Sequence, residues 1–269
     1  MKLCFPVCSP ESDVSIMAMS GDFEENVKFL ADLGYDGIEL MVRYPSIYLA
    51  EFAAQMMEKY HMEIAAVGVT PIAVHDKLYI SSPSPFVRDK AMAAAYRVID
   101  FASRFRAPFC IGSFRGRISD DSGNKIDDAR AVFKNINNYA KSKGIKVLVE
   151  PQGKSNSNYL NTFAEAEEFK DISGCDNLEF IFDMFHVDNN EQDMLGTIEA
   201  MGKDIGFVHA SDRNRAQLGQ DSMPIDEIFM KLRTVKYNGW VSTEIKQTPD
   251  SETAARLSYE YLDRVRKKK

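Results

Sequence analysis

The sequence predicts a single (β/α)8 barrel of the TIM type that spans residues 1–269. Short apolar runs alternate with longer amphipathic segments from one end of the chain to the other. Several short runs, such as Val147-Leu-Val-Glu150 and Phe180-Ile-Phe-Asp183, are apolar without alternation, as in parallel strands that are covered on both faces. In addition, no long linker or low-complexity insert divides the chain.

The short apolar runs are the predicted strands. Their residues are mostly aliphatic or aromatic, and each run is followed by a segment with helical spacing of its apolar residues. In chain order they are Lys2–Cys8, Gly37–Val42, Glu63–Val69, Pro108–Ser113, Lys146–Glu150, Leu178–Phe185, Ile205–His209 and Trp240–Ile245.

The longer segments are the predicted helices. The first of them, Phe23–Leu33, follows Ser20-Gly-Asp22, which offers a capping side chain, and stops at Gly34, a residue that commonly ends helices. The others are Ile47–Tyr60, Val87–Arg106, Asp127–Lys143, Thr162–Phe169, Glu191–Met201, Pro224–Val235 and Ser251–Val265.

An open, doubly wound sheet is the alternative to a closed barrel. Such a sheet normally carries a glycine-rich phosphate turn after its first strand. Here that region reads Ser9-Pro-Glu-Ser-Asp13, and the chain contains neither GxGxxG nor GxxxxGK[ST]. The sequence therefore favours the closed barrel.

Composition excludes several classes of partner. Among the 269 residues, 40 are acidic and 33 basic, which gives a net charge of −7 and argues against a nucleic-acid-binding surface. No apolar run approaches the roughly 20 residues that cross a bilayer. Pro6 interrupts the first apolar stretch, which is too short to be the apolar core of a secretory signal. The four cysteines form no CxxC pair. We therefore expect a cytoplasmic protein with reduced thiols.

Four consecutive predicted strands end in a side chain that can bind a metal: Glu150, Asp183, His209 and Glu244. A barrel carries its reactive groups at the carboxyl ends of its strands, so these four should face one opening. Three carboxylates this close together would repel one another unless a cation or protons compensated. Three oxygen donors and one nitrogen suit Mn²⁺, Mg²⁺ or Co²⁺, with Zn²⁺ also possible.

Other charged residues near the strands are ambiguous. Arg115 and Arg117, near the fourth strand, could meet a phosphate or carboxylate, or could equally be exposed loop arginines. His61 and His75 lie away from the strand-end pattern, so we expect surface or helix-end positions for them.

Five short motifs lie at the ends of predicted strands, and their order along the chain indicates a family resemblance. They are Gly34-Tyr-Asp-Gly-Ile-Glu39, Val149-Glu150-Pro151, Asp183-Met-Phe-His186, Val208-His209-Ala-Ser-Asp212 and Thr243-Glu244-Ile-Lys246. In these motifs the chain resembles the xylose-isomerase-like TIM-barrel superfamily of sugar isomerases and epimerases. The resemblance covers nearly the whole chain and is closest to the ketose 3-epimerase and hydroxypyruvate isomerase branch.

The resemblance implies roles for individual residues. The four strand-end side chains would bind one divalent metal, and Glu150 and Glu244 would also move protons. His186 and Arg215 would contact substrate oxygens, and Glu39 would line the pocket. The resemblance also implies a small sugar or keto-acid substrate and a homodimer or homotetramer.

This arrangement suits chemistry next to a carbonyl. Removal of a proton from the carbon beside a ketone leaves an enediolate, whose charge a divalent ion can stabilise. Two carboxylates on opposite faces of the sugar would invert the carbon, whereas return of the proton to the neighbouring carbon would interconvert aldose and ketose. The sequence thus predicts an isomerase or epimerase of a non-phosphorylated ketose or small hydroxy-ketone.

Three other functions compete with this prediction. Loss of a β-hydroxyl after the same proton removal would make the chain a lyase, such as an inosose or dehydroshikimate dehydratase. A non-catalytic sugar-binding barrel is the second alternative, but the four metal-capable residues argue against it. An abasic-site endonuclease with the same barrel needs many histidines, and this chain has only four.

Two departures from the ketose 3-epimerase pattern affect the prediction of the substrate. That branch often carries a further Glu six residues after the strand-five ligand, where this chain has Asn156. The loop after strand seven usually reads Pro-Gly after its arginine, where this chain has Leu218-Gly219. Both changes lie in loops that would contact the sugar.

Overall fold

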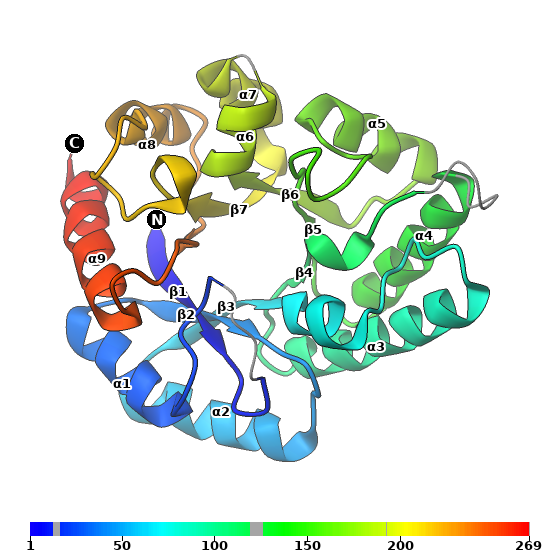
Figure 1. Ribbon diagram of the computed structural model, residues 1–269, viewed down its shortest axis with the longest axis horizontal. Helices are drawn as coiled ribbons and strands as arrows, with labels where there is room; N and C mark the ends of the chain where they lie inside the picture. Colours follow the sequence, from blue (N-terminus) through cyan, green and yellow to red (C-terminus); the bar gives the residue numbers. More distant parts are fainter. Residues whose placement is uncertain (13–16, 119–125, 192, 269) are drawn as a thin grey trace.

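The computed structural model describes residues 1–12, 17–118, 126–191 and 193–268. Eight parallel strands pair in chain order, and β8 closes on β1 to complete a barrel. Helices surround the barrel, and the two chain ends lie on the same side of it (Figure 1). The predicted (β/α)8 architecture is therefore confirmed.

All eight predicted strands are present, although most are shorter than predicted. The trimmed residues lie mainly at the carboxyl ends, where the chain leaves the sheet to form the mouth of the barrel. The strands are β1 Lys2–Cys8, β2 Gly37–Met41, β3 Glu63–Gly68, β4 Phe109–Ile111, β5 Val147–Val149, β6 Leu178–Asp183, β7 Ile205–Ala210 and β8 Trp240–Thr243.

The helices match the prediction at α1 and α2 and shift by a few residues elsewhere. Side chains cap many of them; for example, Asp22 accepts a hydrogen bond from the amide of Glu25 at the start of α1. The bounds are α1 Phe23–Leu33, α2 Ile47–Tyr60, α3 Pro85–Ser103, α4 Ile126–Ser142, α5 Phe163–Ser173, α6 Met184–Asn190, α7 Met194–Met201, α8 Ile225–Thr234 and α9 Ser251–Lys267.

One helix was not predicted. The sixth strand was expected to run to Phe185, but it ends at Asp183, and α6 follows immediately. The cause is local, since the Asp183 carboxylate accepts a hydrogen bond from the amide of His186 and so caps the helix. The helix predicted from Glu191 begins instead at Met194, and residue 192 of that prediction lies outside the described residues.

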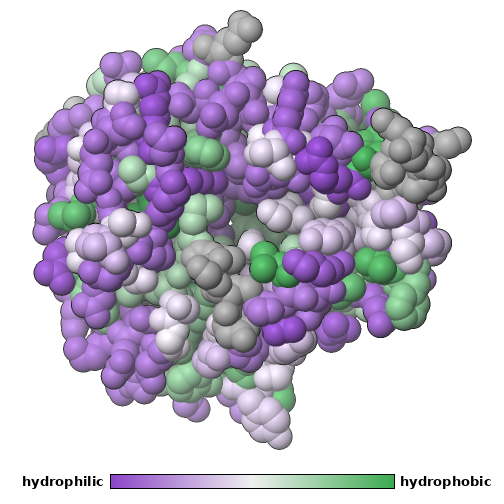
Figure 2. Space-filling view, viewed as in Figure 1, coloured by the Kyte–Doolittle hydropathy of each residue, from purple (hydrophilic) through white to green (hydrophobic). Residues whose placement is uncertain are grey.

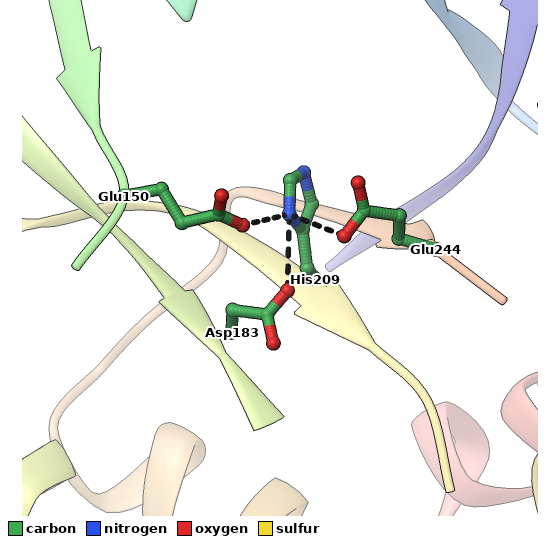
Figure 3. A group of neighbouring side chains, drawn as sticks. All are labelled: Glu150, Asp183, His209 and Glu244. Atoms are coloured by element: carbon green, nitrogen blue, oxygen red, sulfur yellow. Dashed lines mark hydrogen bonds and ion pairs between the residues drawn. The ribbon is translucent and has the colours of Figure 1, made fainter. Parts of the chain in front are cut away.

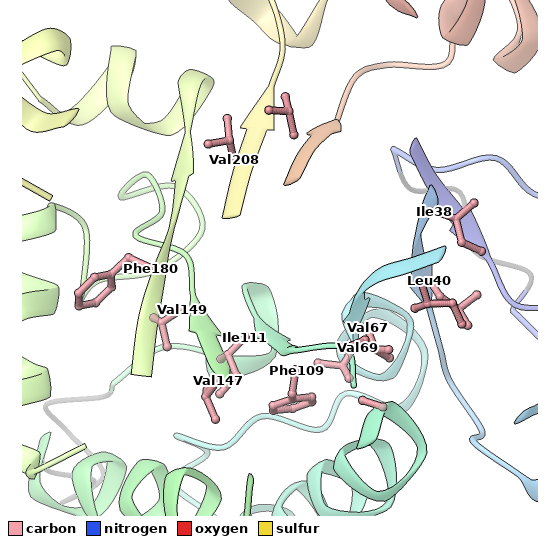
Figure 4. Close-up of a cluster of buried hydrophobic side chains, with 14 of the residues drawn as sticks. Ile38, Leu40, Val67, Val69, Phe109, Ile111, Val147, Val149, Phe180 and Val208 are labelled. Carbon is pink, nitrogen blue, oxygen red and sulfur yellow. The ribbon is translucent and has the colours of Figure 1, made fainter. Parts of the chain in front are cut away.

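The strands separate two apolar regions. Outward-facing residues such as Ile38, Leu40, Phe109 and Val149 pack against the helices and form the main core (Figure 4). Inside the barrel lies a smaller cluster of Cys4, Ala65, Ala66, Cys110, Leu148, Ile181 and Phe207. All four cysteines are buried with free thiols.

The inner cluster supports the mouth of the barrel directly. Side chains two positions apart along a strand share one face. Leu148, Ile181 and Phe207 each precede a predicted metal ligand by two residues, so the next inward-facing side chain along each path is Glu150, Asp183 or His209. The apolar side chains inside the barrel therefore lie directly below the polar side chains at its mouth.

No membrane-crossing helix occurs among the described segments, because none of their helices is both long and apolar enough.

Candidate active site

The four predicted metal ligands meet at the mouth of the barrel. One ligand atom from each of Glu150, Asp183, His209 and Glu244 lies within 4.8 Å of the others. Three carboxylates surround the imidazole, and those of Glu150 and Glu244 approach it from opposite sides (Figure 3). Strand register explains part of this convergence, since Asp183 on β6 pairs with His209 on β7.

The His209 ring is the centre of the cluster. Its Nδ1 lies 2.8 Å from Oε1 of Glu150, 3.3 Å from Oδ2 of Asp183 and 3.4 Å from Oε2 of Glu244. The opposite nitrogen, Nε2, lies 3.3 Å from the carboxylate of Glu39 on β2. The imidazole is buried, so both nitrogens depend on these partners rather than on water.

Asp183 uses its two oxygens for different purposes. Oδ1 accepts the hydrogen bond from His186 that caps α6. Oδ2 faces the cluster and accepts a hydrogen bond of 2.7 Å from Nη1 of Arg215. The same guanidinium nitrogen lies 2.9 Å from Oε2 of Glu244, so one buried arginine bridges two carboxylates.

A buried aspartate holds the loop that carries Arg215. The carboxylate of Asp212, just after β7, accepts hydrogen bonds from four backbone amides of that loop, those of Arg213, Gly219, Asp221 and Met223. Gly219 has a positive φ of 86°, a conformation that glycine adopts without strain. Leu218-Gly219, the departure noted in the sequence, therefore keeps the glycine on which this loop depends.

Electrostatic interactions hold protons within the cluster. Burial raises the pKa of Glu244 to about 8, with further repulsion from Glu150 and Asp183. Burial opposes protonation of His209, but the surrounding carboxylates, Glu39 and Glu244 foremost, raise its pKa well above the usual value. Burial also opposes ionisation of Asp183, but Arg215, His186 and His209 together outweigh it and hold the pKa of Asp183 well below its usual value.

The donor set fits a hard or borderline divalent cation. It offers three carboxylate oxygens and one imidazole nitrogen, with no thiolate in the group. Oε2 of Glu244 is buried yet accepts no hydrogen bond of good geometry among the described residues. A cation at the centre would satisfy that oxygen and replace the protons that the cluster otherwise holds.

The cluster forms part of the wall of a cavity of about 990 Å³ at the mouth of the barrel. Figure 2 shows the surface hollowed near the middle of this face. The three residues predicted to contact or line a substrate site, Glu39, His186 and Arg215, all line the cavity. Asn156 lines it too, so the position where the family pattern places a Glu offers a neutral amide here.

The His186 ring lies between two N–H donors. The backbone amide of Gly153 lies 3.3 Å from Nδ1, and Nη2 of Arg215 lies 3.4 Å from Nε2. A neutral imidazole accepts a hydrogen bond at only one nitrogen, so Gly153 and Arg215 compete for the ring's single acceptor.

The sequence interpretation was wrong about Arg115 and did not identify Gln152. Arg115 is fully buried, and its guanidinium donates to the carbonyls of Glu150 and Leu160 and to the hydroxyl of Ser157. It therefore fixes the loop after β5 rather than meeting an anion. Gln152 donates from Nε2 to Oε2 of Glu150 at 2.5 Å; its place two residues beyond a strand-end carboxylate was the available signal.

The neighbouring Arg117 is exposed and donates to the carbonyls of Lys154 and Ser155, as one of the two expectations for it required. His61, at the left-handed end of α2, is an exposed helix-end residue as expected. His75 is half-buried but also lies near a helix end, in the last turn of the π-helix Ile72–Asp76.

Comparison with known proteins places these features in a family. Residues 27–265 match the family model described as xylose isomerase-like TIM barrel. The chain is 26% identical to a probable ketose 3-epimerase of a Synechocystis species over 82% of this chain and 77% of that protein. It is 28% identical to a D-psicose 3-epimerase of Agrobacterium fabrum, over 84% of this chain and 80% of that protein.

A solved structure shares the fold along its whole length. The D-psicose 3-epimerase of Clostridium cellulolyticum H10, determined with D-tagatose, superposes with a TM-score of 0.81 at 18% sequence identity. The match covers 99% of this chain and 98% of that one.

We predict that Arg115→Ala destabilises the protein by at least about 2 kcal/mol, whereas Arg117→Ala changes stability by no more than about 0.5 kcal/mol. The first change removes three buried hydrogen bonds, including the one to the Glu150 carbonyl, and the second affects only exposed carbonyls. Urea unfolding with a chelator present measures both. Equal effects of the two substitutions would contradict the role given to Arg115.

We also predict that binding of a divalent cation at pH 7 releases protons. At that pH Glu244 and His209 are protonated in the cation-free protein, because their pKa values are raised, and both must lose a proton to become ligands. Apparent affinity for Mn²⁺ should therefore rise from pH 6 to 8.

Calorimetric titrations in two buffers of different ionisation enthalpy measure the number of protons released. The release attributable to Glu244 should shrink above pH 8, where the free carboxyl is already ionised. An affinity that is flat between pH 6 and 8 would contradict this electrostatic account.

Proposed function

The chain belongs to the xylose isomerase-like TIM barrel family, and we propose that it is a divalent-metal-dependent epimerase or isomerase of a non-phosphorylated ketose or small hydroxy-ketone. The observation that carries this proposal is the approach of two glutamates, Glu150 and Glu244, from opposite sides of one four-residue cluster in the wall of a cavity. The relatives named as ketose 3-epimerases support it.

The proposed metal site consists of Glu150, Asp183, His209 and Glu244. A bound divalent ion supplies Lewis-acid stabilisation of charge on the substrate's carbonyl and neighbouring hydroxyl oxygens. Mn²⁺, Mg²⁺ and Co²⁺ suit the donor set, and Zn²⁺ is compatible with it.

The two glutamates are the proposed proton carriers. One carboxylate removes the proton from the carbon beside the carbonyl, and the other returns a proton from the opposite face, which inverts that carbon. Glu150 follows β5 and Glu244 follows β8, and their carboxylates lie on either side of His209. A sugar bound over the cluster would have one of these carboxylates on each side of the reacting carbon. A single carboxylate that removed and returned the proton could instead transfer it to the neighbouring carbon and isomerise the sugar.

His186 and Arg215 are the proposed substrate-orienting residues. His186 lies in the cavity wall, with Nε2 of its ring 3.4 Å from Nη2 of Arg215. Arg215 is held by Asp183 and Glu244, which keeps its remaining N–H groups in a fixed direction. Hydroxyl and carbonyl oxygens of a small sugar are the acceptors that these groups recognise.

The neutral Asn156 separates this chain from the family pattern at one point of the cavity wall. An amide both donates and accepts hydrogen bonds, whereas a carboxylate only accepts them. We therefore propose that the preferred sugar differs from that of relatives with Glu at this position.

A cytoplasmic location and assembly as a homodimer or homotetramer remain predictions from the sequence.

Incubation of the metal-loaded protein with a panel of ketoses in deuterated water tests the proposed function. The panel contains D-fructose, D-psicose, D-tagatose, L-ribulose and hydroxypyruvate, each with Mn²⁺, Mg²⁺ or Co²⁺. We expect deuterium in at least one substrate, and NMR locates the labelled carbon. Absence of both label and metal binding would refute the proposal, while an enone absorbance would indicate a dehydratase instead.

Matched substitutions assign the proton carriers. Glu150→Gln and Glu244→Gln should each lower the exchange rate by at least about 10²-fold, since each removes one acid–base group. Glu63→Gln is the control, because Glu63 lies exposed at the start of β3, at the opposite end of the barrel. A protein that binds a sugar without catalysis would retain binding in all three variants and exchange deuterium in none.

A further inference from the structure

We propose that Glu39 is a positioning residue for the metal site: it holds the His209 imidazole so that Nδ1 faces the cation and Nε2 carries the proton. This inference rests on the metal site of the proposed function. The sequence predicted only that Glu39 lines the pocket, whereas the inference gives it a role in orienting His209.

The contact between the two side chains joins opposite parts of the barrel. Glu39 lies on β2 and His209 on β7, 170 positions apart in the sequence. Nε2 of His209 lies 3.3 Å from both carboxylate oxygens of Glu39. Only 1% of Glu39 is exposed, so water does not compete for this contact.

A third residue fixes the carboxylate in turn. The hydroxyl of Ser242 on β8 donates to Oε2 of Glu39 at 2.7 Å. Ser242 is also the strand partner of His209 in the β7–β8 register. The serine and the imidazole therefore approach Glu39 from adjacent strands, and both carboxylate oxygens have partners within the protein.

The ring chemistry explains why this contact matters for a cation. A metal needs the lone pair of Nδ1, so the single proton of the neutral ring must lie on Nε2. A buried N–H without an acceptor is costly, and a carboxylate is the strongest acceptor that a side chain offers. Glu39 thus favours the required tautomer and increases the electron density that Nδ1 presents.

The geometry favours a positioning role over direct contact with substrate. Glu39 lines the cavity, but its two oxygens are already engaged by Ser242 and His209. In addition, only 1% of Glu39 is exposed, which leaves little of it within reach of a bound molecule.

Metal titration of the full-length protein tests the inference. Calorimetry with Mn²⁺ should show a loss of affinity of about 10–100-fold in Glu39→Ala. Glu39→Gln, which keeps an acceptor oxygen without the charge, should lose less. Ser242→Ala should also lose less, because it frees the carboxylate without removing it.

Leu40→Val is the matched control. Leu40 is the next residue of the same strand and is fully buried, but it faces the helices rather than the site. The substitution should lower stability modestly and leave Mn²⁺ affinity unchanged. Thermal unfolding without metal shows which variants are folded; if Glu39→Ala does not fold, Glu39→Gln and Ser242→Ala still decide the question.

A second readout reports the tautomer directly. With diamagnetic Zn²⁺ bound, ¹⁵N NMR of the wild type should show a slowly exchanging N–H at Nε2 of His209. That proton should exchange much faster in Glu39→Ala. The chain has only four histidines, so substitution of each in turn assigns the signals.

The outcomes separate the two proposals. Absence of metal binding by the wild type would refute the proposed function and this inference together. If the wild type binds Mn²⁺ and folded Glu39→Ala binds it equally well, only the role of Glu39 fails. A variant that changed KM for the sugar but neither metal affinity nor the Nε2 proton would make Glu39 a substrate contact and overturn the inference.

Discussion

The accumulation of negative charge around one imidazole is the constraint on which the rest of the site depends. Three carboxylates share a space less than 5 Å across with His209, and a fourth, Glu39, lies behind the ring. Arg215 compensates part of this charge by bridging Asp183 and Glu244. The remainder is met by protons on Glu244 and His209, or by a divalent cation in their place. Buried like charges lower the stability of a fold unless protons or a cation neutralise them. A cluster of this kind therefore indicates a functional site.

Hydrogen bonds and packing around the cluster hold its side chains in place. Asp212 organises the loop after β7 through four backbone amides, and fully buried Arg115 ties the loop after β5 to the carbonyl of Glu150. Below the ligands, Leu148, Ile181 and Phe207 fill the barrel interior. Glu150, Asp183 and His209 are therefore held from beneath by packing and from the side by hydrogen bonds, and Arg215 holds Glu244 by an ion pair.

The relatives named as ketose 3-epimerases match most of this chain, and a solved one shares its barrel. The cluster of three carboxylates and one histidine sits at strand ends, where the fold fixes position closely. Asn156 and Gln152 lie in the loop after β5 and line the cavity, and Gln152 also donates a hydrogen bond to Glu150. In barrels of this type the strand ends hold the reactive groups, whereas the loops contribute the rest of the cavity wall.

The sequence by itself determined the order of the eight strands and the four side chains at their carboxyl ends, because both are local: apolar runs predict strands, and the residue that ends each run is at the mouth. It could not predict α6, which depends on one capping bond from Asp183, or the burial of Arg115. Only the tertiary structure decided that Nδ1 of His209 faces the three carboxylates of the proposed metal site and Nε2 faces Glu39, because Glu39 and His209 are 170 positions apart in the sequence. Such contacts arise from closure of the barrel, which brings β2, β7 and β8 around one interior and leaves no periodic trace in the chain.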